Sequence, residues 1–171
     1  MSQVYLLRHA KAVWPSPGQK DFDRALDSAG IESATVLGEE MKRAGLQPDV
    51  VICSTAVRAR QTLEHIGVKP PFILETLEKL YSGTADNYLT AIRMAGLEHE
   101  NASSVMLVGH NPMMEDVAMA LAGRGDPPAH PVFAAGFPTA GLAVINFDRP
   151  LAEIRPGTGT LSTFLSPSEH L

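Results

Sequence analysis

The sequence predicts an α/β fold, a three-layer α/β/α sandwich in which helices cover both faces of a mostly parallel central sheet. Short apolar runs alternate with longer segments of helical periodicity, which is typical of βαβ units. The run Val-Met-Leu-Val at residues 105–108 is apolar throughout, as expected of a strand buried on both faces. The chain has 171 residues, of which 44% are hydrophobic and 19% charged, so residues 1–171 fit a single domain.

The first elements are a strand, a long loop and a helix. Residues 3–8 form an apolar run, and residues 12–27 are rich in Pro, Gly and Asp. The helix that follows extends to about residue 43, and Gly45 is well placed as the residue that ends it. Its apolar residues recur at steps of three and four, which supports the helix: Ile31, Ala34, Leu37, Met41 and Ala44.

The middle of the chain repeats this pattern. Residues 50–53 predict a second strand, which leads into a helix that ends near Gly67. Residues 72–75 predict a third strand. Asp86 is the expected N-cap of the next helix, which we expect to stop at Gly96.

The last part begins with the buried strand at residues 104–109, and Pro112 is expected at the first position of the following helix. A Gly/Pro-rich loop and two strands at one side of the sheet complete the prediction: residues 123–138, 142–147 and 160–164. We expect that loop to form one rim of the ligand cleft.

Composition and charge exclude several functions. The net charge is −5 without a block of Lys or Arg, which argues against a nucleic-acid partner. No apolar stretch approaches the roughly 20 residues that span a bilayer, so no membrane partner is expected. The single Cys53 and the lack of a signal peptide after Met1 predict a cytoplasmic protein. No signal for an oligomeric state is visible.

Candidate catalytic residues directly follow three of the predicted strands. Arg8 and His9 end the first strand, Ser54 and Arg58 follow the second, and His110 follows the fourth. Because the carboxyl ends of parallel strands line the ligand crevice, these side chains are expected to converge. Two guanidinium groups, two imidazoles and a hydroxyl suit a phosphoryl group.

This set predicts a covalent mechanism. A neutral imidazole can attack phosphorus, the arginines neutralise charge in the transition state, and water then hydrolyses the phosphohistidine. A single His after a strand is more often an ordinary loop residue, so the prediction depends on the combination. The other histidines lack such a context: His65, His99, His130 and His170.

Three sequence blocks resemble one known family. Residues 7–11, Leu-Arg-His-Ala-Lys, are similar to the Arg-His signature of the histidine phosphatase superfamily, in its phosphoglycerate-mutase-like branch 1. Residues 54–62 and 108–112 resemble its second and third blocks. The short chain, with Asp-Phe-Asp-Arg-Ala-Leu at residues 21–26, looks like the SixA-type phosphohistidine phosphatases.

The resemblance implies a role for each matching residue. It implies that His9 is the nucleophile, that Arg8 and Arg58 bind phosphate, and that His110 completes the pocket. It implies no metal and no cofactor. The expected substrate of the protein is phosphohistidine in another protein, or else a small phosphate ester hydrolysed by the same mechanism.

Four further residues are candidates within the resembling segments. Ser54 and Asn111 are expected to bind substrate, and Arg24 is a candidate for the same task or for a surface role. Glu78 is the nearest match to the general acid of larger family members, with Glu75 as the alternative. A phosphohistidine substrate has less need of this acid than an alkyl phosphate ester has.

Three other readings compete with this one. A cysteine phosphatase needs five residues between Cys and Arg, whereas four separate Cys53 from Arg58. Metal-dependent hydrolysis lacks a His-Glu-x-x-His run, and no strand precedes Asp21 and Asp23. A module that binds phosphate or phosphohistidine without turnover remains open, because the same fold can serve it. Trp14 and Phe22 are expected to pack against the site or a partner.

Overall fold

The computed structural model describes residues 1–122 and 135–167, and the bulk of the 123–138 loop lies outside them. Six strands form one sheet: β1 (Ser2–Arg8), β2 (Val50–Cys53), β3 (Ile73–Thr76), β4 (Ser104–Gly109), β5 (Leu142–Phe147) and β6 (Thr160–Leu165). The α-helices are α1 (Ser28–Arg43), α2 (Val57–Ile66), α3 (Lys79–Ser82), α4 (Ala85–Glu98) and α5 (Met113–Leu121). Two short 3₁₀ helices lie within these described ranges, η1 (Asp21–Asp23) and η3 (Leu151–Glu153).

The sheet has the strand order β3-β2-β4-β1-β5-β6. The pairs β3–β2, β2–β4 and β4–β1 are parallel, whereas β5 pairs antiparallel with β1 and β6 antiparallel with β5. The predicted α/β fold with a mostly parallel sheet is therefore confirmed, and the two antiparallel strands lie at one side of it.

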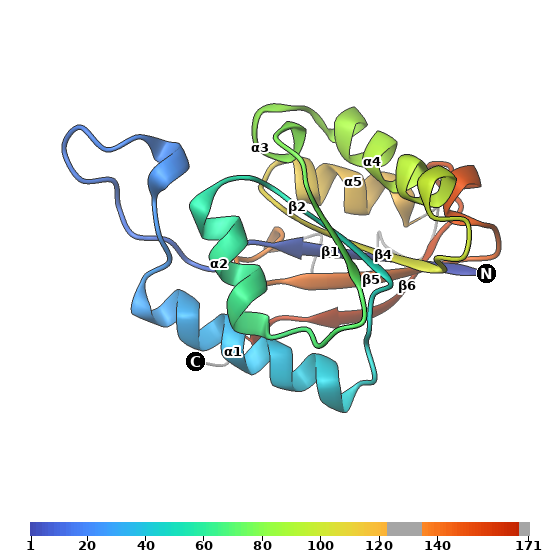
Figure 1. The fold of residues 1–171 in the computed structure, drawn as a ribbon, viewed down its shortest axis with the longest axis horizontal. Helices are drawn as coiled ribbons and strands as arrows, with labels where there is room; N and C mark the ends of the chain where they lie inside the picture. The colour runs from blue at the N-terminus through green and yellow to red at the C-terminus, as the bar shows by residue number, and fades with distance from the viewer. Residues whose placement is uncertain (123–134, 168–171) are drawn as a thin grey trace.

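Helices cover both faces of the sheet, as the alternation of side chains along the strands requires. In Figure 1, α1 and α2 lie on one side, and α4 and α5 lie on the other. Leu6 of β1 belongs to the core under α4 and α5, whereas Leu7 belongs to the core under α1 and α2. The three-layer sandwich thus has two apolar cores with the sheet between them.

Three boundaries differ from the prediction. The N-cap of α4 is Thr84, which forms a capping box with Asn87, and Asp86 lies in the first turn. The helix continues past Gly96 to Glu98, and Gly96 serves close packing and not helix termination, since a Cβ there would collide with the backbone of Ala152. Pro112 is the N-cap of α5 and not its first helical residue. The short helices η1 and α3 were not predicted.

The first loop projects beyond the carboxyl end of β1 (Figure 1). An isolated antiparallel bridge between Ala12 and Leu26 closes its base, and η1 lies within it. Trp14 is 89% exposed on this loop, and the ring of Phe22 contacts the ring of Tyr81 edge to face. Within the described part of the chain, no helix has the length and apolarity needed to cross a membrane.

Candidate active site

Three adjacent strands bring the predicted residues together. His9 is the first residue after β1, His110 the first after β4, and Ser54 the first after β2. The parallel ladder continues through them: the His9 N–H donates to the Gly109 carbonyl at 3.0 Å and the Ser54 N–H to the Val108 carbonyl at 2.9 Å. The imidazole rings of His9 and His110 consequently lie 5.1 Å apart, centroid to centroid.

The His9 ring is held in one orientation. Its Nδ1 lies 2.7 Å from the carbonyl oxygen of Ala10, and since a carbonyl can only accept, Nδ1 carries the proton. Nε2 therefore has the free lone pair, and the Nε–H of Arg58 donates to it at 3.4 Å. The Ala10 N–H donates in turn to the hydroxyl of Thr62 on α2. These bonds present Nε2 as the reactive nitrogen.

One guanidinium nitrogen of Arg8 is hydrogen-bonded within the protein, and another is buried without a partner among the described residues. Nη1 donates to the carbonyl of Phe137 at 2.7 Å, while the buried Nε has no hydrogen-bond partner among the described residues. A buried donor without a partner costs free energy, so such groups mark places where a ligand binds. An incoming phosphoryl oxygen is an acceptor of the kind that this Nε–H requires.

Arg58 lies in the first turn of α2 and is only 6% exposed. Besides its bond to His9, Nη1 donates to the main-chain carbonyl of Asp21 at 2.8 Å, and Nη2 donates to Asp21 Oδ2 at 3.0 Å. Asp21 belongs to η1, so the first loop folds back onto the arginine of the pocket.

Ser54 and His110 form a buried pair, with Oγ 2.7 Å from Nε2. Ser54 Oγ also accepts the Ala56 N–H at 3.2 Å, so its own hydroxyl proton is free to go to Nε2. The Nδ1 of His110 then carries the ring proton, and this buried atom has no partner within the described ranges. His110 can therefore offer an N–H to a phosphoryl oxygen.

Both histidines are neutral near pH 7. Burial lowers the pKa of His9 to about 3, and the positive charges of Arg58 and Arg8 act in the same direction. Burial likewise lowers the pKa of His110 to about 4, again with help from Arg58. A neutral His9 keeps the lone pair that a nucleophile needs.

Tyr88 of α4 fixes the backbone at His110. Its hydroxyl donates to the carbonyl of Leu80 and accepts the His110 N–H at 3.0 Å. A Cβ at Gly109 would lie 2.4 Å from this hydroxyl, so only glycine permits the approach. α4 thereby fixes the position of the His110 backbone at the end of β4.

The remaining candidates are engaged by protein atoms. Arg24 donates from Nε to the Val13 carbonyl and from Nη1 to Asp21 Oδ1. Asn111 Nδ2 donates to the Phe137 carbonyl at 3.1 Å. Both lie beside the pocket residues, since Asp21 and Phe137 also bind Arg58 and Arg8.

Glu78 is exposed at the start of α3 and accepts a hydrogen bond from Ser82 at 2.9 Å. No hydrogen bond or ion pair among the described residues joins Glu78 to His9 or His110, so its role as general acid stays a prediction. The alternative, Glu75, is hydrogen-bonded to His99.

Two pocket residues escaped the sequence prediction. Asp21 binds Arg58, and the Tyr81 hydroxyl donates to Asp21 Oδ2 at 2.9 Å while its ring packs against His110 at 5.4 Å. A signal existed for Asp21, because it opens the Asp-Phe-Asp-Arg segment that marks the resemblance. Tyr81 lies on the unpredicted helix α3 and had no such signal.

Cys53 does not fit a nucleophile. Its side chain is fully buried, and burial raises the pKa of the thiol to about 12, so it stays protonated. One group of three potential metal ligands occurs among the described residues, Glu75, Glu98 and His99. It contains Glu75, the alternative candidate for the general acid, but neither His9 nor His110, and His99 is already hydrogen-bonded to Glu75 at 2.7 Å.

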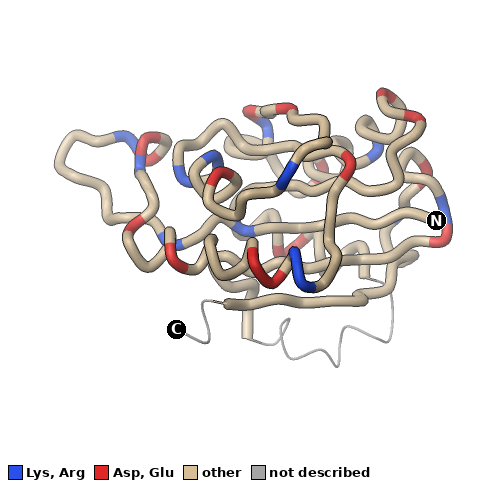
Figure 2. The backbone as a smooth tube through the Cα atoms, turned by 60° about the horizontal axis from the view of Figure 1, so that its bottom comes forward, with Lys and Arg blue, Asp and Glu red and all other residues tan. Residues whose placement is uncertain are grey.

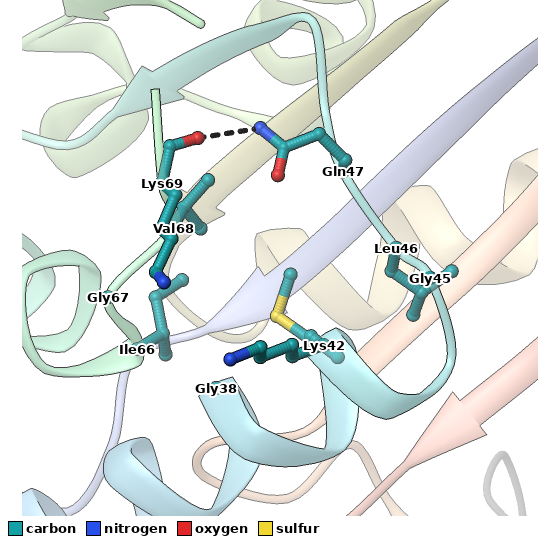
Figure 3. Close-up of a pocket in the computed structure, with 10 residues that line it drawn as sticks. Gly38, Lys42, Gly45, Leu46, Gln47, Ile66, Gly67, Val68 and Lys69 are labelled. Atoms are coloured by element: carbon teal, nitrogen blue, oxygen red, sulfur yellow. Dashed lines mark hydrogen bonds between the residues drawn. The ribbon is translucent and has the colours of Figure 1, made fainter. Parts of the chain in front are cut away.

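A separate cavity of about 220 Å³ lies between the carboxyl ends of α1 and α2 (Figure 3). Met41, Leu46 and Ile66 contribute to its wall, together with the side chains of Lys42 and Lys69. None of the residues around His9 lines it. The candidate active site is thus defined by its hydrogen bonds and not by this hollow.

Comparison with known proteins gives the family. The sequence profile of the histidine phosphatase superfamily (branch 1) matches residues 4–87. A solved structure of a SixA protein from Agrobacterium tumefaciens is 35% identical, with a TM-score of 0.82 over 97% of this chain and 98% of that one. The phosphohistidine phosphatase SixA of Escherichia coli is 26% identical over 167 residues, which is 96% of this chain and 94% of its own length.

A second SixA structure, from Nakamurella multipartita, is 28% identical and has a TM-score of 0.82. The similarity covers 97% of this chain and 96% of that one. The chain therefore belongs to branch 1 of the histidine phosphatase superfamily and, within it, to the SixA type.

Proposed function

We propose that this protein is a phosphatase that transfers a phosphoryl group first to His9 and then to water. The observation that carries the proposal is the state of the His9 ring. The Nδ1–H of His9 donates a hydrogen bond to the Ala10 carbonyl, so the lone pair lies on Nε2, which faces the Arg58 guanidinium. A neutral imidazole beside a fixed positive charge suits attack on an anionic phosphoryl group.

Three donors are placed to hold the phosphoryl oxygens. Arg8 supplies its orphaned Nε–H, Arg58 its Nε–H beside His9, and His110 its Nδ1–H. The two guanidinium groups neutralise the charge that the oxygens carry through the transition state, and the neutral imidazole of His110 adds a hydrogen bond. These residues are preorganised by the strand ends and α2, so little reorganisation is needed when substrate binds.

The reaction has two balanced steps. In the first, the bond between phosphorus and His9 Nε2 forms as the bond to the leaving group breaks. The phosphorylated ring becomes positively charged, and its Nδ1–H remains bonded to the Ala10 carbonyl. In the second, water attacks phosphorus, the electron pair of the P–N bond returns to Nε2, and a proton of the water passes to a phosphoryl oxygen, so that dihydrogen phosphate leaves.

Phosphohistidine in a protein is the substrate that fits this site best. An imidazole protonated on its other nitrogen leaves without an acid, whereas an alkoxide leaving group needs one. Glu78, the expected acid, is exposed and bonded to Ser82. The similarity to Escherichia coli SixA points to the same substrate class. A small phosphate ester is the second candidate.

We further propose that the protein acts in the cytoplasm and without a metal ion. The donors above already neutralise the phosphoryl charge, so no cation is required. Basic and acidic residues are interspersed along the described chain (Figure 2), which gives no reason to propose a nucleic-acid partner.

Trapping the phosphoenzyme tests the mechanism. The protein is mixed with radiolabelled phosphoramidate in chelator, quenched within milliseconds, and the label is tested in acid and alkali. We expect an adduct that is lost in acid and survives alkali, in the wild type and in the control His65→Ala. His9→Ala should form no adduct and keep less than about a thousandth of the turnover.

An acid-stable adduct, or turnover without any adduct, would move the nucleophile away from His9. The substrate class is tested with the same preparations. We expect faster hydrolysis of a phosphohistidine protein than of an aryl phosphate, and equal or reversed rates would favour the small ester. Tight phosphate binding without turnover of either would favour a binding module.

A further inference from the structure

Asp21 occupies most of the guanidinium group of Arg58. The main-chain oxygen of Asp21 accepts a hydrogen bond from Arg58 Nη1 at 2.8 Å, and its Oδ2 accepts one from Nη2 at 3.0 Å. The third nitrogen of Arg58, Nε, faces His9. The two terminal nitrogens of the Arg58 guanidinium are therefore bound by the loop at residues 12–27, and its Nε–H points to Nε2 of His9. A planar fork held at two nitrogens cannot rotate about its long axis.

The carboxylate of Asp21 is itself held from two directions. Arg24 Nη1 donates to Oδ1 at 3.0 Å, and the Tyr81 hydroxyl donates to Oδ2 at 2.9 Å. Arg24 is anchored in the loop through the Val13 carbonyl, and Tyr81 lies on α3 with its ring 5.8 Å from Arg58 Cζ. Asp21 thus links the loop, α3 and α2 at one point.

Asp21 is ionised throughout the working range of the enzyme. Partial desolvation would raise the pKa of this carboxyl, but hydrogen bonds from Arg24, Tyr81 and Arg58 outweigh it and lower the pKa to about 2. A permanent negative charge therefore stands beside the arginine that faces the phosphoryl site. This charge repels a bound phosphate and offsets the charge of Arg58.

We propose that Asp21 is a positioning residue that aims Arg58 at the phosphoryl group on His9 and weakens the binding of the product phosphate. The aiming of Arg58 rests on the proposed function, since it presumes that the phosphoryl group is transferred to His9. The weakening of phosphate binding concerns anion binding alone and does not depend on that transfer. An ordinary ion pair at the surface would change neither quantity, because such pairs contribute little.

Asp21→Asn tests both parts, with Asp23→Asn as the matched control on the same short helix. Asp23 is exposed and lies two residues away in η1. For Asp21→Asn we expect kcat for phosphoramidate to fall about 10- to 100-fold. We also expect the Kd for inorganic phosphate, measured by calorimetry, to fall about fivefold as the repulsion is removed. The control should keep both wild-type values.

A Tyr81→Phe variant provides a second measurement, because it removes one hydrogen bond to Asp21 and keeps the ring. We expect a smaller loss of kcat in the same direction. An unchanged kcat together with an unchanged phosphate Kd in Asp21→Asn would overturn the proposal, as would weaker phosphate binding in a variant of wild-type melting temperature. If the wild type turns over no phosphoramidate, the proposed function fails, while the phosphate Kd still decides the second part.

Discussion

Ser54 shows how one hydroxyl can set the chemistry of its neighbour. It was expected to bind substrate, but the structure places its Oγ on Nε2 of His110 in a fully buried position. A hydroxyl that donates to Nε2 keeps the ring proton of His110 on Nδ1. In the proposed mechanism His110 is therefore the residue that donates to the phosphoryl oxygen, and Ser54 acts through it.

We therefore expect Ser54→Ala to lower kcat about 10- to 100-fold with little change in KM, because His110 can adopt the wrong tautomer. Steady-state hydrolysis of phosphoramidate measures both constants. Ser33→Ala removes another buried serine, in α1, and serves as the control that should keep wild-type kinetics. A kcat for Ser54→Ala within twofold of the wild type would contradict this role.

The sequence predicted which residues meet at the strand ends but not how the loop binds them. Arg8, His9, Arg58 and His110 converge because strand ends on a parallel sheet must meet at one edge. Asp21 reaches Arg58 across 37 residues of sequence, and this contact depends on the path of a loop without periodicity. Such a path is fixed by individual hydrogen bonds, which no local pattern encodes.

At the scale of elements, the first loop is an ordered projection. The Val13 N–H donates to the Ala25 carbonyl at 2.9 Å, and the Ser16 N–H donates to the Gln19 side chain at 3.1 Å. Between these bonds, Trp14 is 89% exposed. A large aromatic side chain on an ordered loop beside the pocket is well suited to anchor a protein substrate.

Trp14→Ala should therefore lower kcat/KM for a phosphohistidine protein about tenfold and leave hydrolysis of phosphoramidate unchanged, because only the protein reaches the loop. Both substrates are measured with the same preparation. Leu97→Ala, which removes another exposed apolar side chain from the end of α4, should affect neither. Equal losses on both substrates would show that Trp14 supports the fold and not docking.

The elements that the prediction missed are short. α3 has four residues and η1 has three, which is too few for a periodic apolar face. The N-cap of α4 is Thr84 and not Asp86, since the capping box that Thr84 forms with Asn87 fixes the start of the helix. The strands β1, β2, β4 and β5 were predicted from apolar runs whose side chains fill the two cores, whereas the edge strands β3 and β6 are less buried and gave a weaker pattern.

At the scale of the whole molecule, two neutral histidines at the site link stability to pH. The pKa of His9 is about 3 and that of His110 about 4 in the folded protein, against about 6.5 in the unfolded chain. Below pH 6.5 the unfolded chain therefore binds protons that the folded protein does not. Stability from this source is complete above pH 6.5 and is lost as the pH falls toward 4.

We expect the free energy of unfolding to fall by at most about 1.4 kcal/mol per pH unit for each of these histidines between pH 6 and 4.5. Asp21 does not contribute in this window, because its pKa is lowered from 3.8 to about 2 and its effect appears only below pH 4. Urea denaturation at several pH values measures the slope. His9→Gln and His110→Gln should each make it shallower, since each removes one depressed titration. Equal slopes in the wild type and both variants would mean that the two rings are protonated in the folded protein near pH 5, which would also deprive His9 of its lone pair there.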